Sequence, residues 1–476
     1  MFTSLDQLLA YCRESGIEIA DFKIVDVAGR WHHLSIPISR LSAKTLEAGI
    51  GFDGSSYGFL TVEKSDMVFI PDISTAVIDP FYEHRTISMI GDIYTLGDAI
   101  KRYESDPRFI AEKAETYMRE TGVADEYRIL PEFEFYLFDQ VAYRVQPNHM
   151  EFLVDTEEAE WNSGDKERFN AGYKVPHKGG YHLALPHDNS SDLRSEMTLT
   201  LERMGVSMKY HHHEVGGPGQ MELEVEPGPM KEMADKTVLI KYVVKNLALV
   251  HGRTATFMPK PLFGEAGNGM HVHMQLFKEG RPLFYDSAGY AGLSQTAMYY
   301  IGGLLKHAPA LLALTNPSTN SYKRLVPGYE APISICFGVA NRSSVIRIPA
   351  YANQPEEKRF EFRSSDATCN PYLAYSAMLL AGLDGIRRRI DPVAEGFGPL
   401  DANIFELSDD ERAKIGALPK SLDEAAQALE RDHEFLLEGG VFSRAFLGNW
   451  LKRIRQEAAR VSLLPHPEEY RLYYDV

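Results

Sequence analysis

Residues 210–226, YHHHEVGGPGQMELEVE, gather three adjacent histidines and four glutamates around a Gly-Gly-Pro-Gly turn. If the segment is strand, turn and strand, its side chains alternate between two faces. His212 and Glu214 then share one face. The return strand directs its glutamates to one face and its apolar residues to the other, namely Glu222, Glu224 and Glu226 against Met221, Leu223 and Val225. The apolar side should be buried, so the carboxylates would line a cleft or the interior of a barrel.

Carboxylates crowded in this way raise one another's pKa unless a cation neutralises them. Oxygen-rich sites with one imidazole suit Mg²⁺ or Mn²⁺ better than Zn²⁺. The pattern therefore predicts a site for a hard divalent cation. The alternative is a solvated acidic strand face beside a chance run of histidines, and this segment alone does not distinguish the two.

Other strand-like segments show the same alternation, with polar residues on one face and apolar residues on the other. The polar faces carry Glu132, Glu134, His271, His273, Arg359, Glu361 and Arg363, the strand-like NRSSVIRIP supplies Arg342 and Arg347, and the loop before it carries Arg324. Each segment alone could be a wet edge strand or a structural histidine pair. Together they predict an antiparallel sheet curved around a polar cavity. Carboxylates beside arginines fit a pocket for polyphosphate bridged by divalent metals.

The nucleotide-binding motifs of two large families are absent from the sequence. There is no GxxxxGK[ST] motif and no kinase-type Gly-rich loop with its lysine. The residues therefore indicate phosphoryl chemistry on a different fold. By themselves they do not separate a ligase from a metal-dependent phosphohydrolase.

Composition narrows the class of protein. The 476 residues are 44% hydrophobic and carry a formal charge of −17, which argues against nucleic acid as a partner. Three widely separated cysteines form neither a disulfide framework nor a zinc pattern and fit a reducing compartment. The first residues lack the basic start of a signal peptide, and no apolar run reaches the ~20 residues of a membrane span. We expect a soluble, cytoplasmic protein.

Two domains are expected. Residues 1–105 predict a small β-rich domain with one or two helices and a Gly/Ser loop, GFDGSSYGFL, that presents Asp53. Residues 106–476 predict the larger domain, with helices near 108–121, 192–204, 231–250, 292–314 and 371–388. Residues 140–190 are polar and rich in glycine and predict a long irregular loop or flap.

The motifs resemble those of the type I glutamine synthetase family, and the match runs nearly end to end. It includes GFDGSS, PEFEFYLF, KGGY, HHHEV, GQMELE, GNGMHVH, NPSTNSYKRLVPGYEAP, NRSSVIRIP and RFEFRSSD. The resemblance implies an α+β fold: an N-terminal β-grasp domain and a C-terminal catalytic domain with a curved antiparallel sheet flanked by helices (glutamine synthetase/guanido kinase-like). It also implies a dodecamer of two hexameric rings, with each active site between neighbouring subunits.

The resemblance implies a role for each candidate residue. One divalent ion would be held by Glu134, Glu214 and Glu222, and another, nearer the ATP phosphates, by Glu132, His271 and Glu361. Contacts to ATP and the transferred phosphoryl group would come from His212, Arg342, Arg347 and Arg359. Glutamate would be bound by Tyr181, Gly267, Arg324 and Arg363. Asp53 would help to deprotonate bound ammonium, and Glu330 would shield the intermediate.

These roles imply ATP-dependent joining of ammonia to the γ-carboxylate of L-glutamate, with two or three Mg²⁺ or Mn²⁺ ions per site. A carboxylate is a poor electrophile, so ATP would first convert it to γ-glutamyl phosphate, which a closing loop must protect from water. The alternatives are a γ-glutamyl ligase that uses another amine or a polyamine, and a non-catalytic relative.

Three positions depart from the family pattern. Ala266 stands where an asparagine commonly contacts the substrate amino group, and Asn268 is the nearest possible substitute. Phe405 falls where adenylylated members have tyrosine, which predicts no adenylylation there. Pro227 falls where some members place an aromatic residue near the adenine.

Overall fold

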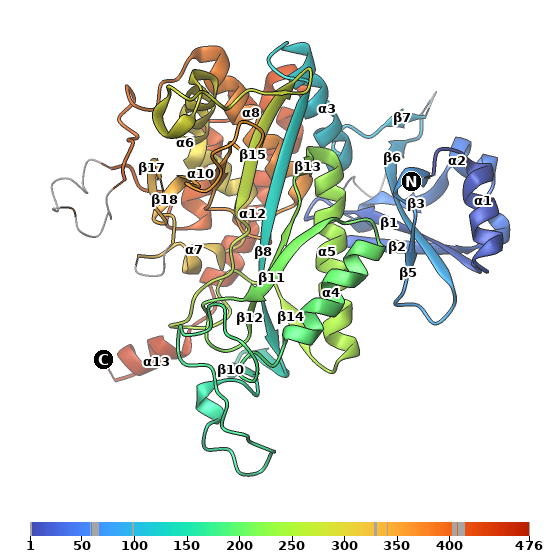
Figure 1. Cartoon of the computed structure of the whole chain (residues 1–476). Coiled ribbons are helices and arrows are strands. Elements are labelled where there is room, and N and C mark those ends of the chain that lie inside the picture. The colour runs from blue at the N-terminus through green and yellow to red at the C-terminus, as the bar shows by residue number, and fades with distance from the viewer. Residues whose placement is uncertain are drawn as a thin grey trace.

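The N-terminal unit of the computed structural model is a twisted sheet with two helices on it (Figure 1). The structure describes residues 2–57, 59, 66–97, 100–327, 331–339, 341–401, 407 and 415–475. Within these, the sheet runs in the order β2-β1-β6-β4-β3, and β5 and β7 also pair with β6. Its strands are β1 (Ile19–Val25), β2 (Trp31–Pro37), β3 (Ile50–Asp53), β4 (Asp66–Pro71), β5 (Val77–Asp79), β6 (Thr86–Thr95) and β7 (Lys101–Arg102). The helices are α1 (Leu5–Glu14) and α2 (Ala43–Ala48).

The larger unit is built on a second sheet, in the order β11-β12-β8-β15-β19-β18-β17, with β13 and β14 also paired to β8 and β16 to β15. Its strands are β8 (Glu126–Phe138), β11 (Met208–His213), β12 (Gln220–Val225), β13 (Gly228–Pro229), β14 (Thr254–Thr256), β15 (Val272–Lys278), β16 (Arg281–Pro282), β17 (Ser334–Val339), β18 (Ser344–Ile348) and β19 (Phe360–Phe362). The expected antiparallel pairing holds except that β17 and β18 run parallel, so the sheet is mixed. Alternation fixes the face of a side chain but not the direction of the neighbouring strand.

Helices cover the apolar side of this sheet (Figure 1). They are α3 (Pro107–Glu120), α4 (Ser191–Arg203), α5 (Met230–Val250), α6 (Gln295–Thr315), α7 (Ser321–Arg324), α8 (Pro371–Arg388), α10 (Leu422–Arg431), α11 (Glu434–Leu437) and α12 (Arg444–Ser462). The last helix, α13 (Pro467–Tyr473), lies apart from this body and has no buried residue (Figure 1). The long predicted helices are present within a few residues of their expected ends. The side chain of Asn370 caps α8 by accepting a hydrogen bond from the Tyr372 N–H at 3.1 Å.

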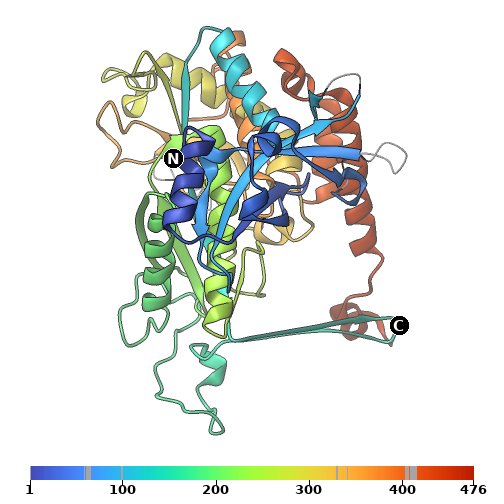
Figure 2. The same ribbon diagram turned by 90° about the vertical axis from the view of Figure 1, so that its right-hand side faces the viewer.

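The expectation of an irregular loop over residues 140–190 is wrong for its first third. Residues Gln140–Gln146 (β9) and His149–Asp155 (β10) form a two-stranded hairpin that extends from the body as a long arm (Figure 2). Its apolar side chains are exposed, with Tyr143 at 79% and Phe152 at 66%. The alternation was present in the sequence and was overlooked, since Val141, Tyr143 and Val145 of β9 pair with Val154, Phe152 and Met150 of β10.

The N-terminal unit contacts the larger one at several points, two of which involve Gly29 and Arg108. Gly29, at the turn between β1 and β2, has a φ of +79°, and a Cβ there would lie 2.8 Å from the Cα of Asn370. Glycine therefore allows both the turn and its close approach to α8. Arg108 of α3, 1% exposed, forms 2.8 Å ion pairs with Asp72 and Asp92 of the N-terminal unit and Asp235 of α5. No helix within the described ranges is both long and apolar enough to cross a membrane.

Candidate active site

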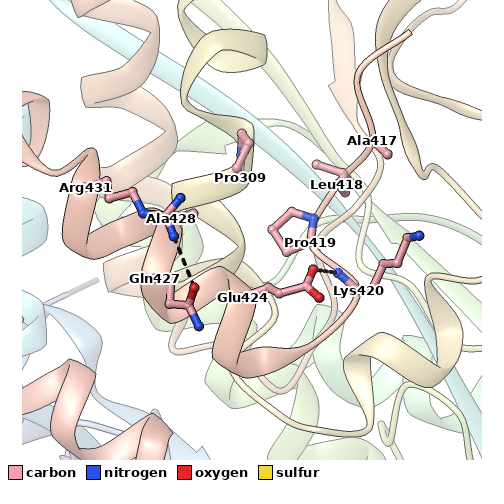
Figure 3. Close-up of a pocket in the computed structure, with 9 residues that line it drawn as sticks. All are labelled: Pro309, Ala417, Leu418, Pro419, Lys420, Glu424, Gln427, Ala428 and Arg431. Atoms are coloured by element: carbon pink, nitrogen blue, oxygen red, sulfur yellow. Dashed lines mark hydrogen bonds between the residues drawn. The ribbon is translucent and has the colours of Figure 1, made fainter. Parts of the chain in front are cut away.

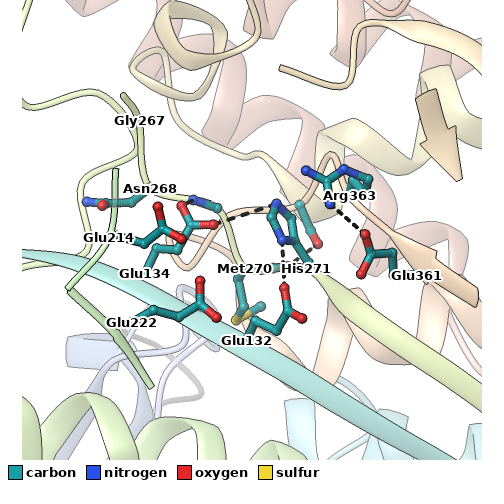
Figure 4. Close-up of polar contacts among 12 residues, drawn as sticks. Glu132, Glu134, Glu214, Glu222, Gly267, Asn268, Met270, His271, Glu361 and Arg363 are labelled. Carbon is teal, nitrogen blue, oxygen red and sulfur yellow. Dashed lines mark hydrogen bonds and ion pairs between the residues drawn. The ribbon is translucent and has the colours of Figure 1, made fainter. Parts of the chain in front are cut away.

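A wall of carboxylates lies on the polar side of β12 and β8. The two strands pair so that Glu222 stands opposite Glu134 and Glu224 opposite Glu132. Their intervening apolar residues, Met221, Leu223, Phe133 and Phe135, are fully buried on the other side. Figure 4 shows the side chains of Glu132, Glu134, Glu214 and Glu222 gathered around one space. The strand β8 is central, so its glutamates are not the wet face of an edge strand.

The first candidate cation cluster joins β11 to β12. His212, Glu214 and Glu222 each offer a ligand atom, and these atoms lie within 4.8 Å of one another. Burial, Glu222 and Glu134 together raise the pKa of Glu214 well above its usual range. Burial, Glu132 and Glu134 do the same for Glu222. These carboxylates resist ionisation in the absence of a cation, as the sequence pattern predicts.

The second cluster consists of Glu132, His273 and Glu361. Nε2 of His273 lies 2.9 Å from Oε1 of Glu132 and 2.9 Å from Oε2 of Glu361. Burial would lower the pKa of His273, but Glu361 and Glu132 raise it to about 9. Burial would raise the pKa of Glu361, but Arg363 and His273 hold it well below its usual range. The two carboxylates on Nε2 thus favour the protonated form of His273.

His271 bridges the two halves of the wall. Its Nδ1 lies 2.8 Å from Oε2 of Glu132, and its Nε2 lies 3.7 Å from Oε1 of Glu134. Glu134 also accepts a 2.7 Å hydrogen bond from the backbone N–H of Gly269. The sequence predicted that His273 shares a face with His271 but gave His273 no role. Its spacing of two residues from His271 was the only sequence feature that pointed to a role in the site.

Arginines surround Glu361. Arg363 donates to Oε1 of Glu361 at 2.5 Å, and Arg347 donates to the same oxygen at 3.0 Å. Arg359 instead stacks on the ring of Tyr351, 5.5 Å from its centroid, and donates to a backbone carbonyl. Within the described part of the chain, the Nε–H groups of Arg347, Arg359 and Arg363 are buried without an acceptor. Three buried donors without partners indicate that an anion belongs beside them.

The loop before β15 packs tightly on Arg324. A Cβ on Gly267 would lie 2.8 Å from Cγ of Arg324, so a larger residue would displace that side chain. Arg324 donates to the backbone carbonyls of Ser364 at 2.9 Å and Arg363 at 3.1 Å. Its guanidinium is therefore held in place beside His271, with an Nη2 to Nε2 distance of 3.4 Å.

Asn268 does not replace the side chain missing at Ala266. It is 1% exposed, and its amide donates to the carbonyls of Met258 at 2.9 Å and Thr256 at 3.4 Å. Its oxygen accepts from Gln220 at 3.0 Å. Both N–H groups are already used in fixing the loop, so the suggested substitution by Asn268 does not occur in this conformation.

Tyr181 and His212 form an aromatic rim over the carboxylates. Their rings meet edge-to-face with centroids 5.4 Å apart, and His182 packs against both. Burial, Glu214 and Glu222 raise the pKa of Tyr181, whereas the positive charge of Arg342 lowers it. The charge of Arg342 therefore acts on this rim.

One expected site residue, Asp53, lies apart from the clusters. Asp53 ends β3 in the N-terminal unit, separate from the strands that carry the carboxylates (Figure 1). Its carboxylate accepts hydrogen bonds from the hydroxyl groups of Ser55 and Ser56. Glu330 and Phe405 lie outside the described residues.

The donor set fits hard divalent ions. Carboxylate oxygens outnumber imidazoles in both clusters, and no thiolate takes part in either. This composition favours Mg²⁺ or Mn²⁺. When bound, such ions would neutralise the repulsion among the glutamates and polarise phosphate oxygens.

Comparison with known proteins agrees with this arrangement. The β-grasp domain model of glutamine synthetase matches residues 16–96, and the catalytic domain model of glutamine synthetase matches residues 104–473. The chain is 48% identical to glutamine synthetase of Frankia alni over 481 residues and 45% identical to that of Streptomyces coelicolor over 480 residues, covering 100% of each protein in both pairs. Among solved structures it is similar to glutamine synthetase of Plasmodium falciparum, with a TM-score of 0.87, 28% identity and 99% coverage of each chain. It is also similar to apo GmaS, with a TM-score of 0.80, 28% identity and 100% coverage of each chain. This chain therefore belongs to the glutamine synthetase family.

Proposed function

We propose that this chain is an ATP-dependent glutamate–ammonia ligase. It joins ammonia to the γ-carboxylate of L-glutamate through γ-glutamyl phosphate and releases L-glutamine, ADP and phosphate. The observation that carries the proposal is the meeting of two carboxylate–imidazole clusters with buried arginine N–H groups that have no acceptor among the described residues. Two anions, a carboxylate and a polyphosphate, can approach each other only where positive charge offsets their repulsion.

We propose that two or three divalent ions, Mg²⁺ or Mn²⁺, bind at this wall. One ion has Glu134, Glu214 and Glu222 as ligands, and another has Glu132, His271 and Glu361. The second set is supported by the contact of His271 with Glu132 and by the contact of Glu361 with His273. His273 holds Glu132 and Glu361 from behind and keeps both carboxylates ionised for the metal.

We propose that the arginines hold the reacting anions. Arg342, Arg347 and Arg359, with His212, bind the ATP phosphates. Arg363 holds the γ-carboxylate and its phosphorylated form, supported by its buried Nε–H, which has no acceptor among the described residues. Arg324, Gly267 and Tyr181 bind the remainder of the glutamate.

We propose that ammonia is delivered by acidic groups. Ammonium predominates near neutral pH, so Asp53 binds the cation and helps to remove its proton. Glu330 shields the acyl phosphate from water and accepts a proton from the adduct. Asp53 belongs to the N-terminal unit, and we propose that it completes the site of a neighbouring subunit.

We propose that the chain works in the cytoplasm as a dodecamer of two hexameric rings. The exposed apolar side chains of the β9–β10 hairpin and of α13, where Tyr473 is 60% exposed, support burial against other copies. Three buried free thiols support a reducing compartment. We place the domain boundary between residues 105 and 106, supported by Asp106, which caps α3.

The test is ATP-dependent formation of γ-glutamyl products from L-glutamate with ammonium, methylamine, ethylamine or putrescine, analysed by mass spectrometry. We expect glutamine from ammonium as the main product and one ADP for each glutamine. Faster turnover with one of the amines would assign the chain to the γ-glutamyl ligases that use that acceptor. No product with any acceptor, in the presence of either Mg²⁺ or Mn²⁺, would refute catalysis.

A further inference from the structure

A groove separate from the carboxylate wall lies along one face of α10 (Figure 3). Its volume is about 350 Å³, within the usual range for small-molecule pockets of about 300–1,000 Å³. The helix contributes Glu424, Gln427, Ala428 and Arg431, whose spacing places them on one face. The opposite side is formed by Pro309 of α6 and by residues 417–420.

The walls of the groove are fixed before any ligand arrives. The backbone N–H of Ile335 donates to Gly416 at 2.7 Å, and that of Leu418 donates to Ile333 at 3.0 Å, so the segment is attached to the start of β17. On the other side, His307 of α6 contacts Asp432, just beyond α10, at 2.8 Å. A preformed groove loses little entropy when a ligand binds.

The lining has an apolar middle and charged ends. Pro309, Ala417, Leu418, Pro419 and Ala428 provide the apolar surface. Lys420 and Glu424 lie toward the start of α10, and Arg431 lies at its end, about 10 Å further along the helix from Glu424 at 1.5 Å per residue.

The polar groups at each end are oriented by their neighbours. The guanidinium of Arg431 donates to Gln427 at 3.1 Å, which directs it along the groove. The carboxylate of Glu424 accepts from the backbone N–H of Lys420 at 2.8 Å. The lining therefore has two cations and one engaged carboxylate, a net positive charge in a chain whose formal charge is −17.

We propose that this groove binds a small organic carboxylate, with its carboxylate on Arg431 and its apolar body over Leu418, Pro419 and Ala428. A second carboxylate at the far end would meet Lys420, so an extended dicarboxylate suits the groove best. Arginine is the residue best suited to paired hydrogen bonds with a carboxylate. None of the lining residues belongs to the proposed catalytic machinery.

The test is calorimetric titration of the full chain with suberate, an eight-carbon dicarboxylate, at two ionic strengths. Arg431→Gln should weaken suberate binding about tenfold or more, because it removes a charge-assisted hydrogen bond. Arg453→Gln, at an exposed position of α12, is the matched control and should leave binding unchanged. Ala428→Leu should also abolish binding, because it fills the groove without a change in charge.

Two comparison ligands complete the test. We expect 1,8-diaminooctane, which has the same length and the opposite charge, not to bind in this groove, and inorganic phosphate to bind more weakly than suberate. Suberate binding that survives both Arg431→Gln and Ala428→Leu would overturn the proposal. Tighter binding of phosphate than of suberate would also overturn it, because the apolar body would then contribute nothing. Urea unfolding midpoints of both variants report whether they are folded, and calorimetry needs no turnover, so this test is independent of the proposed function.

Discussion

Glutamine at position 222 would remove one negative charge from the carboxylate wall while keeping the shape of the side chain. Glu222 is 7% exposed, and one of its oxygens lies within 4.8 Å of an oxygen of Glu214. Two unit charges at that separation repel by about 3.5 kcal/mol at an effective dielectric constant of about 20. Without divalent ions at pH 8, Glu222→Gln should therefore be more stable than the wild type by as much as about 3 kcal/mol.

The stability that Glu222→Gln gains over the wild type without divalent ions should depend on pH. Burial and neighbouring carboxylates raise the pKa of both Glu214 and Glu222, so the folded protein holds protons that the unfolded chain releases near pH 4.3. The unfolded state then binds fewer protons, and the free energy of unfolding of the metal-free wild type should fall as pH rises above about 4.3. Glu222→Gln removes one titrating group and lowers the pKa of the other, so its decline should be shallower.

Divalent metal should make the wild type more stable than Glu222→Gln. Mg²⁺ at about 100 times its Kd should stabilise the wild type by about 2.7 kcal/mol, because it binds only the folded state. The variant lacks one charged ligand and should gain much less. Unfolding midpoints in urea, measured from pH 5 to 8 with EDTA or with Mg²⁺, would test both statements.

The matched control is Glu226→Gln. This glutamate follows β12 in the same alternation but is exposed, so its replacement should change neither the pH dependence nor the gain from Mg²⁺. If Glu222→Gln were destabilised in EDTA at pH 8 by 2 kcal/mol or more, with the wild-type pH slope retained, the argument from repulsion within the wall would be refuted.

Three further changes test other parts of the molecule. Arg108→Leu should lower the free energy of unfolding by about 3–5 kcal/mol in urea denaturation, because it leaves three carboxylates without their shared cation. Gly180→Ala should weaken Mg²⁺ binding in calorimetry, because the new Cβ would lie 2.3 Å from the carbonyl oxygen of Glu214, whereas Gly164→Ala, with open space around it, should not. Asp53→Ala should abolish ammonia-dependent turnover and change the Kd for ATP less than threefold; loss of ATP binding would contradict the role proposed for Asp53.

Alternation in the sequence was sufficient to sort side chains by face. The period of two in residues 220–226 and 132–137 predicted burial of the apolar residues, and Met221, Leu223, Val225, Phe133, Phe135 and Leu137 are all buried. The same period placed Glu226 beside Glu222 and Glu224, but Glu226 lies beyond the end of β12 and is exposed. The predicted helix from Pro371 began where the capping chemistry of Asn370 indicated. The face of a side chain and the start of a helix depend on residues close by in the chain, so both could be predicted from this sequence.

Other features required the tertiary structure, because they depend on contacts between distant segments. The register that sets Glu222 opposite Glu134 is fixed by pairing across about 90 residues of chain. His273 became a partner of Glu361 only when β15 and β19 came together. The amide of Asn268 looked available in the sequence, but it is used by carbonyls 10 and 12 residues away.

The groove on α10 likewise has one part that the sequence predicts and one part that only the tertiary structure shows. Its helix face could be read from the spacing of residues 424–431, but its other wall comes from α6 and from a segment fixed to β17. The sequence by itself determined the types of side chain and the faces they occupy, because local backbone geometry sets both. The tertiary structure alone decided which faces meet, because long-range packing sets the distances on which charge repulsion and metal binding depend.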